Sequence, residues 1–234
     1  MNKLLAFYAK NKMRPRAFDA VRNSEGESTI YLYDTIVSDD EEAAWWGGVS
    51  PMAFIRALDE LNGADVTLRI NSPGGSVFGG QAIAAAMREY AGKINVKVDS
   101  LAASAASIVA ITGDTVQMAP GSFMMIHKAW TIALGNSQDF LDAAALLEKI
   151  DGSLAKQYAL RTGIDIADVA DMMAAETWLD HEEAVSKGFA DSVIESPVKA
   201  NNRWDLSVFD RAPKMEHEME IAHLLRKQRL CEKS

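Results

Sequence analysis

The alternation of short apolar strands with helices in the first half of the chain most strongly constrains the fold. Val66–Ile70 is a β-branched run that predicts a strand, and a glycine-rich turn leads from it directly into a helix predicted over Gln81–Tyr90. A second strand over Ile94–Val98 and a second helix from about Ala102 repeat this pattern. Because parallel strands are joined by crossovers of this kind, we expect an α/β protein with a mostly parallel sheet.

Two longer segments predict how helices pack. Asp139–Leu160 places apolar residues three and four positions apart, which predicts an amphipathic helix with one buried stripe. The alanine- and serine-rich stretch Ser100–Gly113 is expected to be a buried core helix, whereas residues 1–26 show little pattern. Other strands are expected at 29–33, 115–118, 122–126 and just before Ile194, and other helices from Ser38 and over 50–63, 165–175, 180–187 and 216–229.

The composition argues against several classes of protein. The 234 residues include 24 Lys and Arg against 33 Asp and Glu, a net charge of −9, whereas phosphate binding needs concentrated positive charge, so no nucleic-acid partner is expected. The only cysteine is Cys231, which excludes an internal disulfide, disfavours a thiolate metal site and suits a cytoplasmic location. No segment reaches the roughly 20 apolar residues of a membrane span, so no membrane association is expected.

Three features are candidates for chemistry. The turn Asn71–Gly80 lies between a strand and a helix, where amide N–H groups bind an anion or an oxyanion, but it lacks the ending of a phosphate loop. Ser104 is surrounded by very small residues, and Ser100 and Ser107 are rival hydroxyls. His127 ends an apolar strand and is the one of the four histidines placed within the core, which makes it the candidate base at neutral pH.

These features together resemble the proteolytic subunit family of Clp protease, peptidase family S14. The segments Ser-Pro-Gly-Gly at 72–75, Ala-Ala-Ser at 102–104 and Met-Ile-His at 125–127 follow one another in the family's order and at its spacing. The resemblance runs from about Ile30 to Ile194. It implies an α/β fold of the Clp protease/crotonase type, with repeated ββα and βαβ units, a mostly parallel sheet and a long protruding helix.

The resemblance also implies the residues of a serine protease site. Ser104 would be the nucleophile and His127 its base, and the backbone amides of Gly74 or Gly75 and of Ala105 would form the oxyanion hole. No metal or organic cofactor is required. The implied division is an N-terminal lead over 1–26, a catalytic domain over 27–196 and a charged C-terminal extension over 197–234.

The acid of the triad departs from the family pattern, because the family usually has an aspartate there. The matching residue is Glu176, and either carboxylate can orient the imidazole and stabilise imidazolium. Asp171 and Asp180 are the alternatives.

Finer details resemble the phage and prophage branch, the Clp-like head maturation proteases. They are the segments 71–78, 101–107, 135–136 and 176–179, with Glu183-Ala184 after them. The family implies homo-oligomeric rings and polypeptide substrates, which in this branch would be capsid or scaffold proteins. A Clp-type ATPase that feeds unfolded chains remains an alternative partner, and ATP would play no part at the active site itself.

Three rival functions stay open on sequence alone. Enzymes of the crotonase type use the same fold on acyl-CoA thioesters. A Ser–Lys dyad would replace His127 by a lysine such as Lys97 or Lys128. A catalytically inactive, ring-forming assembly protein would retain the fold without the reaction.

Overall fold

Strands from most of the chain meet in one mixed sheet. The computed structural model describes residues 2–14, 17–22, 27–195 and 204–213. The strands are β1 (Ala17–Arg22), β2 (Ser28–Tyr33), β3 (Val66–Ser72), β4 (Ile94–Ala103), β5 (Thr115–Met118), β6 (Phe123–Ile126), β7 (Thr177–Asp180) and β8 (Ser192–Val193). The helices are α1 (Lys3–Asn11), α2 (Asp40–Trp46), α3 (Pro51–Asp59), α4 (Val77–Glu89), α5 (Ala105–Ile111), α6 (Ser137–Thr162), α7 (Ile166–Ala174) and α8 (His181–Ser186).

The sheet is mostly parallel, as the alternation of strands and helices predicts. Its main order is β1-β2-β3-β4-β5-β8, and every pair along it is parallel except the edge pair β1–β2. β4 changes partner along its length: residues 95–98 pair with β5, and residues 101–103 pair with β6. On its other side β6 pairs with the antiparallel strand β7. The prediction of a Clp-type α/β fold is confirmed.

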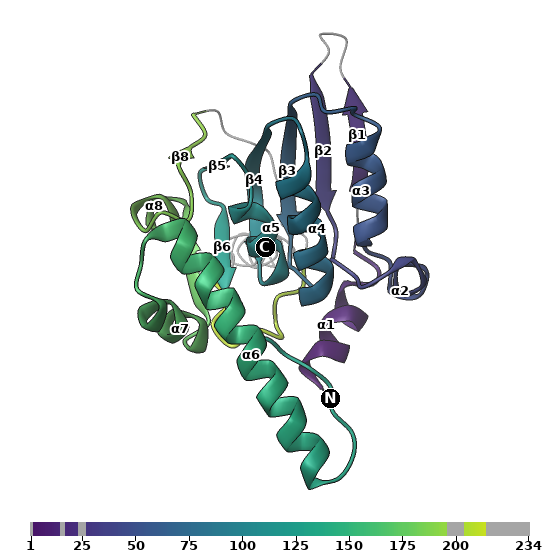
Figure 1. Ribbon diagram of the computed structural model, residues 1–234, viewed down its shortest axis with the longest axis vertical. Helices are drawn as coiled ribbons and strands as arrows, with labels where there is room; N and C mark the ends of the chain where they lie inside the picture. The colour runs from purple at the N-terminus through teal and green to yellow at the C-terminus, as the bar shows by residue number, and fades with distance from the viewer. Residues whose placement is uncertain (1, 15–16, 23–26, 196–203, 214–234) are drawn as a thin grey trace, which may run out of the picture.

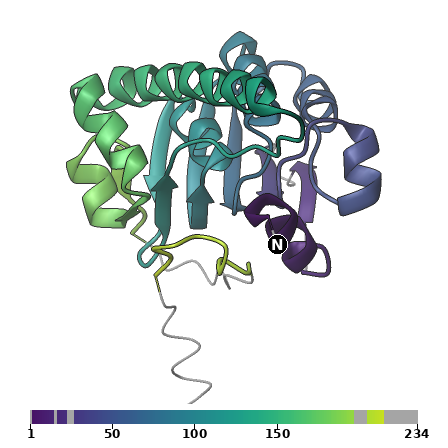
Figure 2. The same cartoon turned by 90° about the horizontal axis from the view of Figure 1, so that it is seen from below.

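Helices cover one face of this sheet, and two segments from the ends of the chain lie against the other. Figure 1 shows α3, α4, α5 and α6 in front of the strands. Figure 2 shows α1 and the described C-terminal segment on the side opposite α6. The main core lies under the four helices, where the inward side chains of β2, β3 and β4 alternate with partly exposed ones. This alternation follows from the two-residue period of a strand.

The described parts of the N-terminal 26 residues form a helix and a strand that the sequence did not predict. α1 and β1 lie within them, so the expectation of a patternless lead is wrong at 3–11 and 17–22. Phe7 and Tyr8 of α1 are buried in a second core cluster that includes Trp204 and Phe209 of the C-terminal segment. The sequence signal was weak because α1 has only one buried face and its apolar partners lie almost 200 residues away in the chain.

The stretch Ser100–Gly113 is not one helix, as expected, but a strand end and a helix. β4 continues to Ala103, and α5 begins only at Ala105. Both parts are buried, so their composition gives no alternation to separate them. Smaller differences are the start of α4 at Val77 and the additional strand β7. The helix expected over 216–229 lies outside the described residues.

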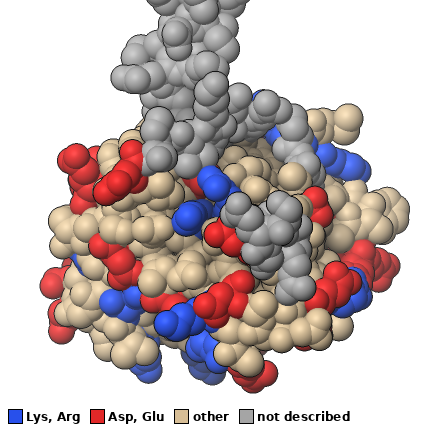
Figure 3. Space-filling view, turned by 90° about the horizontal axis from the view of Figure 1, so that it is seen from above, with Lys and Arg blue, Asp and Glu red and all other residues tan. Residues whose placement is uncertain are grey.

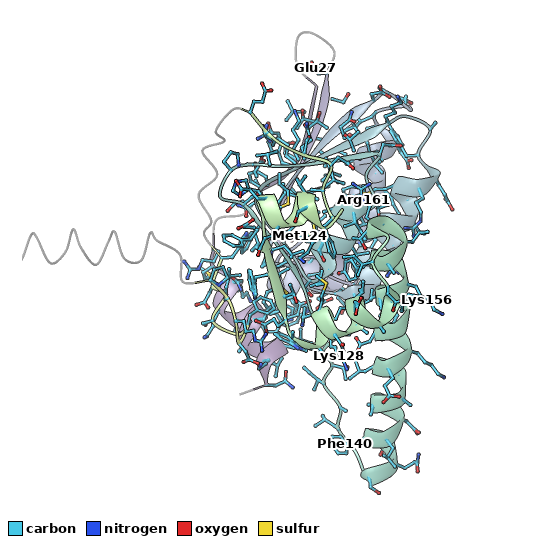
Figure 4. The ribbon with its side chains drawn as sticks, turned by 90° about the vertical axis from the view of Figure 1, so that its left-hand side faces the viewer. Glu27, Met124, Lys128, Phe140, Lys156 and Arg161 are labelled. Carbon is cyan, nitrogen blue, oxygen red and sulfur yellow. The ribbon has the colours of Figure 1, made fainter. Side chains whose placement is uncertain are left out.

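The long helix α6 is confirmed, but its predicted stripe is buried over only half its length. Asn136 and Asp139 form a capping box at its start, and Gly163 ends it in the left-handed conformation. Leu154 and Tyr158 are buried, whereas Phe140 is 52% exposed. Figures 1 and 4 show why: the first half projects beyond the body, and Phe140 lies on this projecting part. The apolar side of the projecting half has no cover within the described chain.

Charged side chains are mixed over the face seen from above. Lys and Arg lie among Asp and Glu there and form no continuous basic patch in the area that is visible (Figure 3). None of the helices in the described part of the chain is long and apolar enough to cross a membrane.

One buried ion pair ties three strands together on the face that α3–α5 do not cover. The side chain of Asp99 on β4 is fully buried, and Arg69 on β3 donates to both of its oxygens, from Nε at 2.8 Å and Nη2 at 2.5 Å. The Tyr33 hydroxyl at the end of β2 donates to the same carboxylate. Arg69 is only partly buried, so the cluster meets solvent on the arginine side.

Removal of this carboxylate is predicted to destabilise the fold. Asp99→Ala leaves the Arg69 guanidinium and the Tyr33 hydroxyl without their acceptor, and breaking a buried pair costs about 3–5 kcal/mol. The free energy of unfolding from urea titration is expected to fall by about this amount. Asp59→Ala, at an exposed position near the end of α3, is the control, with an expected change within about 0.5 kcal/mol. Equal effects of the two substitutions would contradict a structural role for the cluster.

Candidate active site

Ser104 lies at a sharp turn between the central strand and a buried helix. β4 ends at Ala103 and α5 begins at Ala105, so Ser104 alone joins them. Its φ of 53° and ψ of −125° belong to neither helix nor strand, a conformation that residues with a side chain rarely adopt. Its amide donates to the Met125 carbonyl at 2.9 Å. A strained strand–turn–helix of this kind is one way that proteins expose a nucleophile.

The pairing of β4 with β6 brings His127 to this turn. Ala103 and Met125 are register partners, so the residues that follow them in the two parallel strands lie side by side. Nε2 of His127 is 2.7 Å from Oγ of Ser104, within the distance required between a nucleophile and its base. In the tautomer with the proton on Nδ1, the Ser104 hydroxyl donates to Nε2.

His127 is held in a dry, aromatic environment. Its ring meets Trp130 edge-on at 4.7 Å and Phe209 edge-on at 5.6 Å, and only 9% of the residue is exposed. Burial lowers the pKa of His127 to about 4, with Glu176 opposing this shift and Lys3 adding to it. The imidazole is therefore neutral at physiological pH, the form in which it accepts a proton.

The hydroxyls of Ser100 and Ser107, the two alternatives to Ser104, lie in buried positions without a histidine partner in the described chain. Ser107 is fully buried in α5, where its hydroxyl donates to the Ser104 carbonyl at 2.6 Å and meets the Tyr158 hydroxyl at 2.7 Å. Ser100 is buried within β4, before the turn. Among the described residues only the hydroxyl of Ser104 is hydrogen-bonded to a histidine.

Neither of the two lysines considered for a Ser–Lys dyad is the hydrogen-bond partner of Ser104 in the described chain. Lys97 lies in β4 opposite Arg69 and Gln117, seven residues before Ser104 and therefore about 20 Å away along a strand. Lys128, which Figure 4 labels, follows His127 directly and has an exposed side chain. The contact with Ser104 is made by the imidazole of His127. The described residues include no group of three or more His, Cys, Asp and Glu that could hold a metal ion.

The glycine-rich turn presents one free amide beside Ser104. Gly74 and Gly75 both have positive φ, 90° and 142°. A Cβ at Gly74 would lie 2.5 Å from the Ala103 carbonyl oxygen, and one at Gly75 would overlap the Ile36 carbonyl oxygen, so both positions require glycine. The Gly74 amide donates to Ser72 Oγ at 3.2 Å, whereas no hydrogen bond within the described chain involves the Gly75 amide.

Ala105 supplies the second free amide. As the first residue of α5 it has no intrahelical acceptor for its N–H. Gly75, Ser104 and Ala105 line the same pocket. Two amides without partners beside a hydroxyl can stabilise a developing oxyanion, and of the two glycines it is Gly75 whose amide has no acceptor within the described chain.

Glu176 interacts with His127 electrostatically, without a hydrogen bond between the two side chains in the described chain. In the β6–β7 ladder Ile126 faces Thr177, so the next residues outward, His127 and Glu176, come close together. The Glu176 carboxylate raises the pKa of His127, yet it accepts its hydrogen bonds from the amides of Asp210 and Arg211, at 3.0 and 2.6 Å, and from Trp178 Nε1 at 3.2 Å. No hydrogen bond joins it to His127 within the described chain.

The two alternative acids are placed elsewhere. Asp180 faces Phe123 at the far end of β6, and its carboxylate caps α8 by accepting from the amides of Glu182 and Glu183. Asp171 is exposed on α7. Of the three candidates, only Glu176 acts on the charge of His127.

A mostly apolar pocket of about 260 Å³ opens beside Ser104. Several segments that lie far apart in the chain contribute apolar side chains to its walls. They include Val77 and Phe78 of α4, Leu147, Ile150 and Leu154 of α6, Leu4, Phe7 and Tyr8 of α1, and Phe209. The contributions of α1 and Phe209 were not foreseen from the sequence. The sequence signals for them were the apolar run at 4–8 and the alternation of apolar and polar residues at 204–208, followed by Phe209.

Comparison with known proteins decides the family. A family model described as Clp protease matches residues 13–197, which is most of the chain. The chain belongs to the Clp protease family. The resemblance drawn from the three short motifs is thereby confirmed. The family match ends before the described C-terminal segment, residues 204–213, which contributes to the pocket.

Curated relatives agree with this assignment. The ATP-dependent Clp protease proteolytic subunit of Streptococcus agalactiae serotype V is 29% identical over 187 residues, which span 75% of this chain and 94% of the relative. The protein of the same name from Streptococcus pyogenes serotype M1 is 28% identical over the same lengths. Almost the whole of each relative is thus matched by this Clp protease family chain.

The neutral state of His127 predicts a pH dependence of stability. The pKa of His127 is about 4 in the folded protein, against 6.5 for an ordinary histidine. Between these values the unfolded chain binds a proton that the folded protein does not, so stability is full above pH 6.5 and falls as the pH drops toward 4. The loss at pH 4 is expected to reach about 3 kcal/mol.

Urea unfolding of the protein and of His127→Gln between pH 4 and 7 measures this contribution. The difference in unfolding free energy between the two proteins is expected to shrink as the pH falls. A difference that stays constant over the whole range would show that His127 is not held neutral by burial.

Proposed function

We propose that the chain is a serine endopeptidase with Ser104 as nucleophile and His127 as general base. The observation that carries this proposal is the 2.7 Å contact between Ser104 Oγ and His127 Nε2 at a strained turn. The free amides of Gly75 and Ala105 on the same pocket supply an oxyanion hole, and no cofactor is needed. An acyl-CoA enzyme of the crotonase type would use the oxyanion hole but would have no use for the serine–histidine pair.

The reaction follows from these positions. Ser104 Oγ attacks the carbonyl carbon of a peptide bond while His127 Nε2 takes its proton. The carbonyl oxygen becomes an oxyanion that accepts from the Gly75 and Ala105 amides. The C–N bond then breaks, and imidazolium gives its proton to the leaving amine. Water, deprotonated by His127, hydrolyses the acyl-serine and restores the hydroxyl.

Glu176 is proposed as the acid of the triad. When His127 takes the Ser104 proton, a positive charge forms in a site from which water is largely excluded. The Glu176 carboxylate favours that charge, as its effect on the pKa of His127 indicates. It uses three of about four acceptor positions on its two oxygens, so one position remains for His127 Nδ1–H.

The substrate is proposed to be a polypeptide, with an apolar side chain next to the bond that is cleaved. The pocket beside Ser104 is lined mainly by apolar side chains of α1, α4 and α6. Burial of such a side chain would contribute about 1.5–3 kcal/mol to binding. This site has no element that requires ATP.

More specifically, we propose a phage or prophage head maturation protease that acts as a homo-oligomeric ring on capsid or scaffold proteins. The segments 71–78, 101–107, 135–136 and 176–184 support this assignment through their resemblance to that branch. Phe140, Leu141 and Leu146, exposed on the first half of α6, support self-association. A cytoplasmic location and a Clp-type ATPase partner stay predictions of the family resemblance.

A fluorophosphonate probe is predicted to label Ser104. An activated serine attacks the phosphorus of the probe, and tandem mass spectrometry of the digested protein locates the adduct. The label is expected on Ser104 in the unaltered protein and is expected to be lost in Ser104→Ala and in His127→Ala. Casein hydrolysis is expected to fall by a factor of about 10³ or more in both variants.

Ser107→Ala is the matched control, because Ser107 lies one helical turn away and has no histidine partner. It is expected to keep the label on Ser104. A folded, assembled protein that takes no label would overturn the peptidase proposal and favour the inactive assembly protein.

Glu176→Gln is predicted to lower kcat by a factor of about 10²–10⁴ with little change in KM. The amide keeps the size of the side chain but removes the charge that stabilises imidazolium. Asp171→Asn, a similar change on exposed helix α7, is expected to lower kcat less than tenfold. A larger loss in Asp171→Asn than in Glu176→Gln would assign the role of the acid to Asp171.

A further inference from the structure

The described C-terminal segment, residues 204–213, lies beyond the family match yet is packed against the active site. Trp204, Leu206, Val208 and Phe209 are each no more than 8% exposed. They belong to the second core cluster, together with Phe7 of α1, Ala103 of β4 and Met125 of β6. Figure 2 shows the segment lying along the sheet on the side opposite α6.

Specific hydrogen bonds fix the start of this segment. Trp204 Nε1 donates to the carbonyl of Asn71, at 3.1 Å, immediately before the glycine-rich turn. The Asp205 amide donates to Asn11 Oδ1 at 2.8 Å, and Asn11 Nδ2 donates back to the Asp205 carbonyl at 3.1 Å. The segment is therefore anchored to α1 and to the oxyanion turn.

Phe209 is the centre of an aromatic cluster around the catalytic histidine. Its ring is 5.6 Å from His127 at 79°, 5.2 Å from Trp130 at 32° and 5.8 Å from Trp178 at 76°. Edge-to-face rings at these separations attract each other beyond simple burial. Phe209 also lines the pocket beside Ser104.

The residues after Phe209 hold the acid. The amides of Asp210 and Arg211 donate to the two different oxygens of Glu176. The segment thus contacts both partners of Ser104: Phe209 packs on the imidazole, and the two amides hold the carboxylate.

We propose that residues 204–213 are a working part of the active site, in which Phe209 is a positioning residue for His127 and the Asp210 and Arg211 amides position Glu176. This inference rests on the proposed serine peptidase function. Phe209 keeps water from the imidazole and fixes the plane in which Nε2 points to Ser104. A misplacement of about 1 Å in such a group costs on the order of 10²-fold in rate.

Two charged side chains shift the pKa of His127 in addition to burial. They are Glu176, which raises its pKa, and Lys3 of α1, which lowers it. Lys3 is paired with Asp210 at 2.6 Å and lies over the Trp130 ring at 5.4 Å. Substitution of Phe209 leaves all of these charges in place, so a change in the titration of His127 reports the loss of burial.

The experiment compares Phe209→Ala, Phe209→Leu and Leu206→Ala in the full chain. Leu206 is buried in the same segment but does not line the pocket, so Leu206→Ala controls for lost packing. We expect Phe209→Ala to lower kcat about 10–100-fold and to move the acid limb of the kcat/KM profile upward, toward pH 6.5. Phe209→Leu is expected to recover most of kcat, and Leu206→Ala to leave the acid limb in place.

A second measurement separates this inference from the proposed function. In Ser104→Ala protein, which cannot react, the NMR titration of His127 gives its pKa directly. Adding Phe209→Ala is expected to raise that pKa by at least one unit, and adding Leu206→Ala to leave it unchanged. The positioning role is overturned if the Phe209 and Leu206 variants behave alike in both measurements. An unlabelled Ser104 in the probe experiment would overturn the peptidase function without altering this NMR result.

Discussion

The site depends on the change of partner along β4. This strand pairs with β3 over residues 94–98 and, after a shift of register, at Ala102. It pairs with β5 over residues 95–98 and with β6 over residues 101–103. Ala103 pairs with Met125, so Ser104, the next residue after Ala103, lies near His127, which is two residues after Met125. Met124 and Ile126 of β6 pack in the main core cluster and Met125 packs in the second one, so a slip of one residue would place each of these side chains in the wrong cluster.

The same packing that fixes His127 also sets its electrostatics. Aromatic rings on two sides exclude water, which keeps the imidazole neutral but opposes the imidazolium that catalysis requires. Glu176 compensates through its charge, and its carboxylate is in turn held by backbone amides of the C-terminal segment. Burial therefore lowers the pKa of His127 and the Glu176 carboxylate raises it. The balance of the two effects decides how strong a base the histidine is.

Much of the site could be predicted from the sequence because its parts are local. Gly74 and Gly75 are required because neighbouring backbone atoms approach them too closely for a side chain. The residues around Ser104 are small because the turn that holds Ser104 is buried. Which of the two glycine amides lacks an acceptor could not be predicted, because this depends on a hydrogen bond from the Gly74 amide to Ser72 Oγ. Likewise, the register between β6 and β7 places Glu176 near His127 and Asp180 at the far end of β6. The sequence pattern did not reveal β7, so this difference between the two acids could not be predicted.

The sequence by itself determined the α/β class, the parallel sheet and the residue types of the candidate chemistry, since these follow from short-range periodicity and local turns. Only the tertiary structure decided where the ends of the chain lie. α1 and residues 204–213 meet each other and His127 across almost 200 residues of sequence, through rings and backbone amides that no local pattern encodes. Hydrophobic burial is not directional, so an apolar run shows that a segment is buried but not what it is buried against.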